Sequence, residues 1–543
     1  MVGAAGDVGP RATDISHVAL AQFERRRVGE LARDDRRRAL AALGEHEARL
    51  GGPPTKRRGL AGEVFGVQRG EPLFERGSVR VGGTVPLHQA GEVTHRRPRV
   101  DAIVVRVIRH HGAVTSETGV DGDGPVDLST YDPMDREVQQ CPYAHYAAVR
   151  AHGSVFHHER SGMYFAARLD VVNEILRDTE TYSSRMASAA TVADREVMRD
   201  VAAIMAQGWP RRDTMLTIDP PHHTRYRKLV ARSFSARRIA ALEPAIRAIA
   251  VDLIEGFPER GAIDFHADFA VRFPVRVIHQ ALDMAPGTED RIKAWSDAAV
   301  AALGVALTED RWLDAARTQV ESQRYWHDEY QRRLVDPSDD ILSELAHADF
   351  DDPDLSEGEV RPLEFPEVFS ILQQLMVAGN ETTTKLLNET MRLLIEHPEW
   401  WQRLVDDPDA VVGDIVEEGL RMSSPNQGLF RVATRDTAIG GVDIPEGARI
   451  WVMFGAANRD GATFEDPESF DAARDHLREH IAFGKGHHFC IGAPLARLEA
   501  RIALEELSRR LELPALSEGN TFEYEPSYIL RGLAQLDLDI ARR

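Results

Sequence analysis

The sequence is poor in cysteine and has no long apolar run. Only Cys141 and Cys490 occur in 543 residues, and nowhere do 18 apolar residues stand together. Two cysteines so far apart give no disulfide framework, so a reducing compartment is the simplest interpretation. The first residues contain no apolar segment of signal-peptide type. These absences predict a cytoplasmic protein without a membrane anchor.

Positive charge is also scarce. The formal net charge is -21 at pH 7, although the first 120 residues contain more basic than acidic side chains. The rest of the chain is therefore more acidic than the net charge suggests. A strongly acidic surface repels nucleic acid and anionic lipid. We expect no nucleic-acid partner and favour chemistry on a small molecule.

Residues 1–120 differ in composition from the rest of the chain. Their basic charge is almost entirely arginine, glycine is frequent, and apolar periodicity is limited to one helical stretch near residues 15–50. A disordered or accessory extension is one interpretation. The other is that this segment comes from an upstream GC-rich reading frame and is not native protein. Both stay open, and we expect the folded domain to cover residues 126–543.

The main part of the chain alternates amphipathic segments with proline and glycine. Its few strand-like pieces lie at residues 162–167, 438–444 and 449–454, the last two divided by a turn at Pro445 and Gly447. The pattern therefore predicts a mainly α domain with a minor β part. Periodicity predicts helices over 142–152, 170–178, 224–234, 236–256 and 315–335.

The stretch FGKGHHFCIG, residues 483–492, surrounds one of the two cysteines with glycines and histidines. The helical period of the following apolar residues places Cys490 at a helix start, where exposed N–H groups lower the pKa of a thiol and favour thiolate. Gly484 and Gly486 permit backbone conformations that other residues resist. Gly492 lets a flat ligand come close to the backbone.

Three interpretations of this loop compete. A zinc site could use His487, His488 and Cys490, but the sequence offers no second half for it. A nucleophilic cysteine would have histidines nearby but no acyl site. A single thiolate that binds haem iron needs only one sulfur and a flat, glycine-lined approach. The third interpretation uses every unusual residue of the loop, and the other two stay open at this point.

The same stretch matches FGxGxHxCxG at every fixed position and so resembles the haem-binding loop of the cytochrome P-450 monooxygenases. The resemblance implies that Cys490 binds the iron of haem b, that Phe483 shields the sulfur and that His488 hydrogen-bonds a haem propionate. Gly492 would lie against the cofactor. The resemblance also implies the fold class: mainly α with minor β, a triangular helical prism that encloses one haem between a long helix and the thiolate loop.

Three further segments resemble motifs of the same family. Glu418 and Arg421 lie three residues apart and, taken alone, indicate an exposed ion pair. They are similar to the family's ExxR pair, which implies a buried structural network with Arg474. The stretches HHTRYR and FRVATRD are similar to the HxxxR and RxA elements. That similarity implies that the haem propionates are bound by His223, Arg227, Arg431 and His488.

An apolar helix of about 30 residues is expected over 368–400, with GNETTT, residues 379–384, interrupting its centre. A kinked core helix with threonines bonded to its own carbonyls is one interpretation. The other is a resemblance to the family's [AG]Gx[DE]T motif, with Ala378 beside the haem. It implies that Gly379 leaves room for dioxygen and that Glu381 and Thr382 relay protons to the reacting oxygen.

The resemblance implies an oxidoreductase: a haem-thiolate monooxygenase that activates O2 with two electrons. The sequence shows no dinucleotide fingerprint, flavin domain or iron–sulfur cysteine set, so we expect electrons from a separate ferredoxin and ferredoxin reductase, which would approach near Lys485 and Arg497. The segments expected around the substrate, including residues 186–216 and the loop 426–430, are mainly apolar and predict a lipophilic small molecule. The predicted pocket residues are Leu375, Met376, Leu429, Phe430, Ile529 and Leu530.

Two other functions are compatible with a haem-thiolate loop. A peroxide-using enzyme typically lacks the acid–alcohol pair that Glu381 and Thr382 provide. A haem-based sensor would need a signalling output, and residues 1–120 are the only candidate for one. Two measurements separate these functions from a monooxygenase: whether reduced ferredoxin supports turnover, and whether deletion of residues 1–120 changes that turnover.

Overall fold

A computed structural model describes residues 126–543 with the exception of 186–194, 302, 304–306 and 357. The predicted extension, residues 1–120, lies outside the described residues together with its helical stretch. The first part of the predicted substrate segment, residues 186–194, lies outside them as well.

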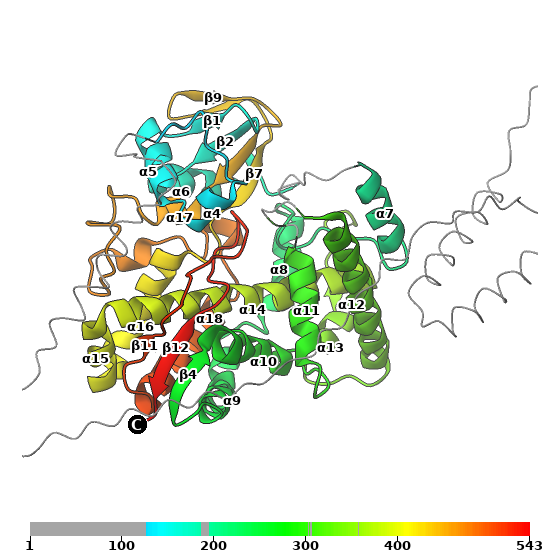
Figure 1. Ribbon diagram of the computed structural model, residues 1–543. Coiled ribbons are helices and arrows are strands. Elements are labelled where there is room, and N and C mark those ends of the chain that lie inside the picture. The colour runs from blue at the N-terminus through cyan, green and yellow to red at the C-terminus, as the bar shows by residue number, and fades with distance from the viewer. Residues whose placement is uncertain (1–125, 186–194, 302, 304–306, 357) are drawn as a thin grey trace, which may run out of the picture. The chain divides into compact units, whose positions relative to one another are not determined.

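The described chain is mainly helical, as the periodicity predicts (Figure 1). A π-helix, η1 (His266–Ala270), precedes α10. Of two 3-10 turns, η2 (Leu477–Glu479) precedes the cysteine loop and η3 (Gly486–His488) lies within it. The α-helices are α4 (Arg136–Gln140), α5 (Tyr143–His152), α6 (Leu169–Arg177), α7 (Arg195–Met205), α8 (His222–Ala231), α9 (Ala236–Glu255), α10 (Arg272–Ala281), α11 (Glu289–Val300), α12 (Glu309–Val335), α13 (Ile341–Ala346), α14 (Phe365–Glu396), α15 (Pro398–Asp406), α16 (Pro408–Ser423), α17 (Phe454–Ala457) and α18 (Ala493–Arg510).

The strands form small sheets. One has the order β1-β2-β10-β7-β3 and mixes antiparallel pairs with the parallel pair β2 and β10; a second has the order β11-β12-β4. Two hairpin-like pairs, β5 with β6 and β8 with β9, complete the β part. The strands are β1 (Phe156–His158), β2 (Met163–Ala166), β3 (Tyr182–Ser183), β4 (Arg260–Asp264), β5 (Asp349–Phe350), β6 (Arg361–Pro362), β7 (Leu429–Ala433), β8 (Thr437–Ile439), β9 (Val442–Ile444), β10 (Arg449–Val452), β11 (Ala515–Leu516) and β12 (Asp537–Ala541).

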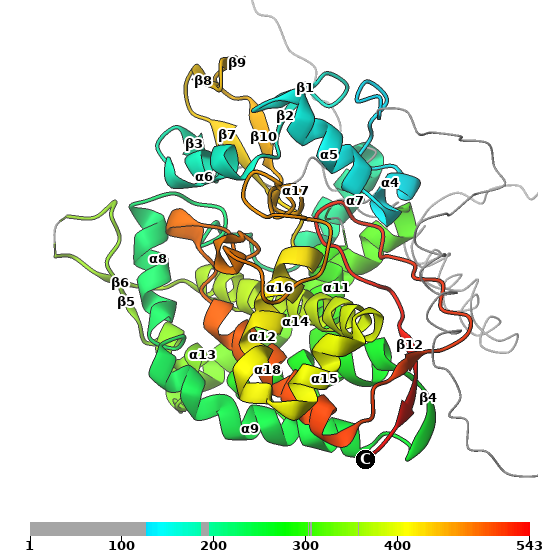
Figure 2. The same cartoon turned by 90° about the vertical axis from the view of Figure 1, so that its left-hand side faces the viewer.

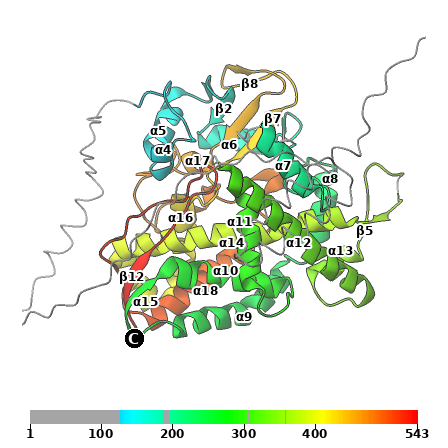
Figure 3. The ribbon, with the colours of Figure 1, turned by 45° about the vertical axis from the view of Figure 1, so that its right-hand side comes forward.

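Helix α14 is the element around which the other helices pack. Figure 2 looks nearly along it and Figure 3 shows it lengthwise, with α16 above it, α10 and α18 below it and α11 crossing it. Its N-terminus is fixed by a capping box in which Glu367 accepts a 2.8 Å hydrogen bond from the Glu364 amide. Apolar side chains along most of its length are buried, so this helix positions whatever its central turns carry.

Most predicted elements are confirmed, and the exceptions have local causes. The predicted strand 438–444 is instead the hairpin of β8 and β9, because Gly440 and Gly441 adopt φ values of 55° and 82° between them. The predicted helix 368–400 ends at Glu396, and Pro398 begins α15. The expected interruption of its centre is absent, since the helix is continuous through residues 378–384. Among the described residues, no helix is long and apolar enough to cross a membrane.

Candidate functional site

A cavity lies between α14 and the loop that carries Cys490. Its lining is largely apolar, and its polar side chains come from the cysteine loop, from α14 and from other segments. Many of the residues that the sequence predicts for the site share this cavity. From α14 it is lined by Leu375, Ala378, Gly379, Thr382, Thr383 and Leu386, from the loop by Phe483, Gly484, Lys485, His488, Cys490 and Gly492, and from other elements by Leu216, Ile278, Asn426, Leu429, Arg431 and Glu499 among others.

The central turns of α14 present one helical face to the cavity. The lining residues from Leu375 to Leu386 are spaced three and four apart, which places them in one stripe. A Cβ at Gly379 would lie 3.1 Å from Cδ1 of Ile278 on α10, so glycine permits this close approach. The hydroxyl of Thr382 donates a 2.8 Å hydrogen bond to the carbonyl of Ala378, the backbone bonding expected for a threonine in an apolar helix.

Glu381 lies on a different face of α14 from the cavity-lining residues. Its carboxylate is buried and pairs with Lys385 Nζ at 3.0 Å and with Lys293 Nζ at 3.5 Å. Burial acts to raise the pKa of Glu381, but the two ammonium groups outweigh burial, so the pKa lies below its ordinary value. The acid beside the cavity threonine is therefore ionised and anchored at neutral pH.

The cysteine loop is shaped by backbone hydrogen bonds and two left-handed glycines. The amide of Cys490 donates to the carbonyl of Phe483 at 3.0 Å, which closes the loop. Gly484 and Gly486 have φ values of 66° and 70°. A Cβ on Gly486 would lie 2.4 Å from the carbonyl oxygen of Leu176 on α6, so this position admits glycine alone without movement of α6.

Cys490 precedes α18, as the periodicity predicts, but its thiol is not activated by position alone. Burial raises the pKa of Cys490 and outweighs the opposing hydrogen bonds from the amides of Gly492 and Ala493 and the charge of Arg227. The prediction that the helix start lowers the pKa of this thiol is therefore wrong, because burial has the larger effect. A coordinated cation reverses this balance, because it deprotonates a thiol that binds it.

Of the four predicted propionate ligands, Arg431 and His488 line the cavity, whereas His223 lies behind His488 and Arg227 is likewise outside the lining. The rings of His223 and His488 lie 4.2 Å apart between centroids, and His488 Nε2 lies 3.0 Å from the Ser184 hydroxyl. Burial, and next the charge of Arg227, lower the pKa of His223 to about 4. Burial, and next the charge of Arg431, lower the pKa of His488 to about 3. Burial therefore disfavours the charged form of both imidazoles.

The buried network predicted around Glu418 is present. Arg421 forms two 2.8 Å hydrogen bonds with Glu418, both side chains are 0% exposed, and Arg474 Nε lies 3.1 Å from Glu418 Oε1. Arg421 also donates to the carbonyl of Asn458 at 2.9 Å, and the side chain of Asn458 accepts from the amide of Ile481 at 2.7 Å. The network therefore reaches the segment that leads into the cysteine loop.

Comparison with known proteins identifies the family. A sequence model of the family "Cytochrome P450" matches residues 332–530. Cytochrome P450 107B1 of Saccharopolyspora erythraea is 37% identical over 325 residues, which is 59% of this chain and 76% of the relative. Vitamin D(3) 25-hydroxylase of Pseudonocardia autotrophica is 36% identical over 333 residues, 61% of this chain and 78% of the relative. The chain belongs to the cytochrome P450 family.

The structural comparison agrees. The crystal structure of CYP109E1 from Bacillus megaterium in complex with testosterone superposes with a TM-score of 0.64 at 29% identity and covers 74% of this chain and 99% of that one. The predicted cytochrome P450 fold, mainly α with minor β, is thereby confirmed. As a cytochrome P450 the protein is a haem-thiolate monooxygenase that uses O2 and a small molecule, and members of the family bind haem b.

The residues of the cavity fit haem b. Both ring nitrogens of His223 and Nε of Arg431 are buried without a hydrogen-bond partner in the part of the chain that the structure describes. Burial lowers the pKa of the Arg431 guanidinium to about 10. Buried donors left in this way are costly, and the two propionates of haem would supply the missing acceptors. Cys490 and Gly492 complete a surface for a flat ligand. Glycine leaves the space beside the sulfur open, where a Cβ at position 492 would lie 3.8 Å from Sγ of Cys490.

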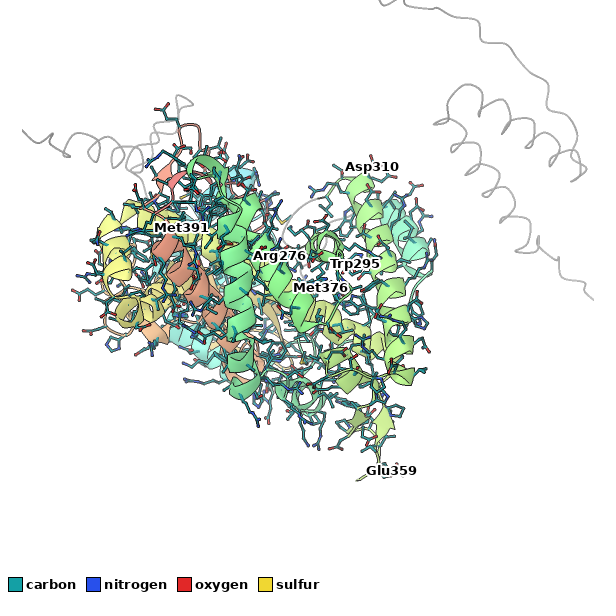
Figure 4. All side chains as sticks on the ribbon, turned by 90° about the horizontal axis from the view of Figure 1, so that it is seen from below. Arg276, Trp295, Asp310, Glu359, Met376 and Met391 are labelled. Carbon is teal, nitrogen blue, oxygen red and sulfur yellow. The ribbon has the colours of Figure 1, made fainter. Side chains whose placement is uncertain are left out.

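The structure corrects part of the predicted substrate pocket of this cytochrome P450. Leu375 and Leu429 line the cavity, but Met376, one residue further along α14, points into the core, where it shares a buried cluster with Trp295 of α11 (Figure 4). The helical period explains this, since neighbours in a helix face about 100° apart. Three other predicted residues are likewise outside the lining and belong to the core under the mixed sheet: Phe430, Ile529 and Leu530.

Two features of the site were missed by sequence reasoning. Glu499 on α18 lines the cavity, and its Oε2 is buried without a partner among the described residues. The sequence indicates this residue only as a single acidic side chain, four residues after Leu495, on the apolar face of a predicted helix. Lys385, four residues after Glu381 in an apolar helix, is buried between Glu381 and Glu525. A lysine within an apolar helix can be seen in the sequence, but its pairing with Glu525 of the C-terminal loop cannot.

Proposed function

We propose that this cytochrome P450 hydroxylates or otherwise oxidises a lipophilic small molecule with electrons from a separate ferredoxin and its reductase. The observation that carries the substrate class is the apolar stripe of α14, which faces the Cys490 loop together with Ile278 and Leu429. An apolar lining of this kind favours an apolar ligand. Two similar proteins, one named for vitamin D(3) and one bound to testosterone, act on or bind molecules of this class.

The cysteine loop and its surroundings would hold the cofactor. When bound, haem b supplies the iron chemistry that activates O2, and Cys490 would be the protein's ligand to that iron. Phe483 would shield the sulfur; the guanidinium of Arg497 lies 4.6 Å above its ring and holds it in place. Ala378 and Gly492 would pack against the faces of the ring. The propionates would be bound by His223, Arg227, Arg431 and His488.

The turn of α14 from Gly379 to Thr382 would transfer protons and leave room for dioxygen in the cavity. Gly379 keeps this part of the cavity wall free of a side chain, which leaves room for dioxygen. The Thr382 hydroxyl lies at the cavity and can pass a proton to a group bound there. The buried Glu381 carboxylate on the neighbouring face can then accept a proton from the surface side and pass it to Thr382. The reaction site on the cavity face of α14 would thus be separated from the charged groups on the other face that supply the protons.

The ion-pair network would have a structural role. Glu418, Arg421 and Arg474 fix the segment that runs through Asn458 to Ile481, and Gly484 N donates back to Ile481 O at 2.8 Å at the start of the loop. A buried charge network of this kind is rigid, because any displacement leaves an unpaired charge. It would set the position of Cys490 without contact with the reactants.

The electron donor would approach the cysteine loop. Phe489 is 39% exposed next to Cys490, and Lys485 is partly exposed on the same loop. Arg497, predicted as a second contact, is instead paired with Glu417 through bonds of 2.5 and 2.9 Å, so its charge is already compensated. Charge reversal at Lys485 should slow reduction by ferredoxin, and an unchanged rate would remove this loop from the docking surface. A cytosolic location remains a prediction from the sequence.

The test of the proposed function is turnover of haem-loaded protein on a panel of lipophilic and polar compounds. With ferredoxin, reductase and isotopically labelled O2, we expect one labelled oxygen in the product of a lipophilic compound. Turnover with hydrogen peroxide alone, at a rate equal to that with ferredoxin, would favour the peroxide-using alternative. A spectral response to ligands without any turnover would favour a haem-based sensor.

A further inference from the structure

A polar seam runs along the face of α14 that turns away from the cavity. Glu381, Lys385 and Asn388 are spaced four and three apart and therefore share this face. Lys385 is among the most buried charged residues of the domain, with its side chain 3% exposed. Its ammonium lies 3.0 Å from Glu381 Oε2 and 2.7 Å from Glu525 Oε2. One cation thus links two carboxylates from distant parts of the chain.

The C-terminal loop is built around this lysine. A Cβ on Gly532 would lie 2.2 Å from Cγ of Lys385, so the loop backbone is in direct contact with the lysine stem. The amide of Glu525 donates a 3.0 Å hydrogen bond to the carbonyl of Gly532, which closes the loop beside Lys385. Glycine at position 532 and the acid at 525 are therefore both explained by the presence of Lys385.

The seam connects buried Glu381 with solvent in two directions. The side chain of Glu381 is 6% exposed, whereas that of Glu525 is 36% exposed on the C-terminal loop. On α11, Lys293 pairs with Glu381 and also with Asp297, which is 53% exposed. On η1, His266 Nδ1 lies 2.8 Å from the Asn388 amide and faces the charge of Glu525.

We propose that Lys385 and Glu525 are positioning residues for Glu381: they hold its carboxylate at the outer face of α14, beside the cavity threonine and at the buried end of a charged route to the surface. The proposal rests on the proposed function, in which Glu381 replenishes the proton of Thr382. It adds the residues that determine where Glu381 lies and from which surface the proton comes.

The energetics of burial support this arrangement. A carboxylate as buried as Glu381 is costly unless cations lie beside it. The Lys385 ammonium opposes the effect of burial and keeps Glu381 ionised, and the charge of Lys385 is itself stabilised by the carboxylates of Glu381 and Glu525. Among the described residues, loss of Lys385 would leave Lys293 as the one ammonium paired with Glu381. Loss of the Glu525 charge would leave Glu381 as the one carboxylate paired with Lys385. The two changes should therefore move the protonation of Glu381 in opposite directions.

The experiment uses the haem-loaded full chain with ¹³C-labelled glutamate and infrared spectroscopy as a function of pH. The Glu381 band is assigned by its disappearance in Glu381→Gln. We expect a protonated Glu381 band at neutral pH in Lys385→Met, where wild type shows carboxylate. Glu525→Gln should keep Glu381 ionised to a lower pH than wild type. Gly532→Ala, which displaces the lysine stem, should resemble Lys385→Met.

The matched control is Glu523→Gln. Glu523 lies two residues from Glu525 on the same loop, is well exposed and pairs with Arg136 instead, so its loss should leave the Glu381 band unchanged. In parallel, product formed per O2 consumed should fall about tenfold in Lys385→Met and show an altered pH profile. Should Lys385→Met fail to fold, Glu525→Gln and Gly532→Ala carry the same test.

The outcomes separate this proposal from the proposed function. A Glu381 band that does not respond to Lys385→Met, Glu525→Gln or Gly532→Ala would overturn the positioning role. A band that shifts as expected, together with full activity and an unchanged pH profile in Glu381→Gln, would confirm the positioning contact. It would overturn instead the proton role of Glu381 in the proposed function.

Discussion

Arg421 and Glu418 form a doubly hydrogen-bonded ion pair that is wholly buried, with both bonds at 2.8 Å. Arg474 and the carbonyls of Asn458 and Pro467 satisfy the remaining polar atoms. The pair joins α16 to the segment before the cysteine loop, so the position of Cys490 depends on a contact that lies far from it in sequence.

Removal of Glu418 should therefore destabilise the whole domain. We expect Glu418→Ala to lower the free energy of unfolding by about 3–5 kcal/mol, because Arg421 is left buried and uncompensated. Haem retention after purification should fall in parallel. Arg317 and Asp314 are also three residues apart but exposed, so Arg317→Ala should lower the free energy of unfolding by less than about 1 kcal/mol. Urea denaturation measures both variants. Equal effects of the two changes would contradict a structural role for the network.

Glu499 should make the stability of the protein depend on pH. Burial raises the pKa of Glu499 well above its ordinary value, so the folded protein retains a proton that the unfolded chain releases above about pH 4.3. Above that pH, wild type should lose stability by up to about 1.4 kcal/mol per pH unit from this group. Glu499→Gln should remove this slope and gain relative stability as the pH rises. Exposed Glu518→Gln should not alter the slope, and a parallel pH dependence in wild type and Glu499→Gln would contradict the prediction.

Two glycines of the cysteine loop should differ in their tolerance of alanine. Both have positive φ, so each replacement costs about 1–2 kcal/mol in backbone strain. Only at Gly486 would the new Cβ also meet backbone, 2.4 Å from Leu176 O, whereas at Gly484 the nearest atom is 3.8 Å away on Phe454. Thermal unfolding should therefore show a clearly larger loss of stability for Gly486→Ala. A larger loss for Gly484→Ala would contradict the loop geometry.

Thr382 should couple oxygen consumption to product. Thr382→Ala retains the shape of the cavity but removes the hydroxyl, so we expect product per O2 to fall about tenfold or more, with the lost oxygen recovered as peroxide. Thr382→Ser keeps the hydroxyl and should stay close to wild type. Equal coupling in the alanine and serine variants would remove the hydroxyl from the proposed proton path.

The sequence predicted the parts of the site that carry local motifs. The loop around Cys490, the charges at Glu418 and Arg421 and the AGNET turn are each short and chemically unusual, so their types and spacing were informative. The structure brings His223, Arg431 and His488 together from three separate segments. Only the resemblance to the family predicted that convergence, because periodicity within each segment says nothing of its neighbours.

The missed and corrected residues depend on tertiary packing. Met376 and Leu375 are both apolar, and only the rotation of α14 decides which of them faces the cavity. Lys385 and Glu525 are separated by about 140 residues, and the glycine that lets them meet, Gly532, carries no charge or motif. The pKa of Cys490 was predicted from the helix start alone, whereas the depth of burial, which no sequence pattern gives, has the larger effect.

We expect Cys490 to be the sulfur ligand of a haem in this cavity. The most direct measurement is the absorption spectrum of purified protein, reduced with dithionite and treated with carbon monoxide, for wild type and Cys490→Ala. We predict a strongly red-shifted Soret band in wild type that is absent from the variant. A haem band that is the same in both proteins, or no haem band in wild type, would contradict the account.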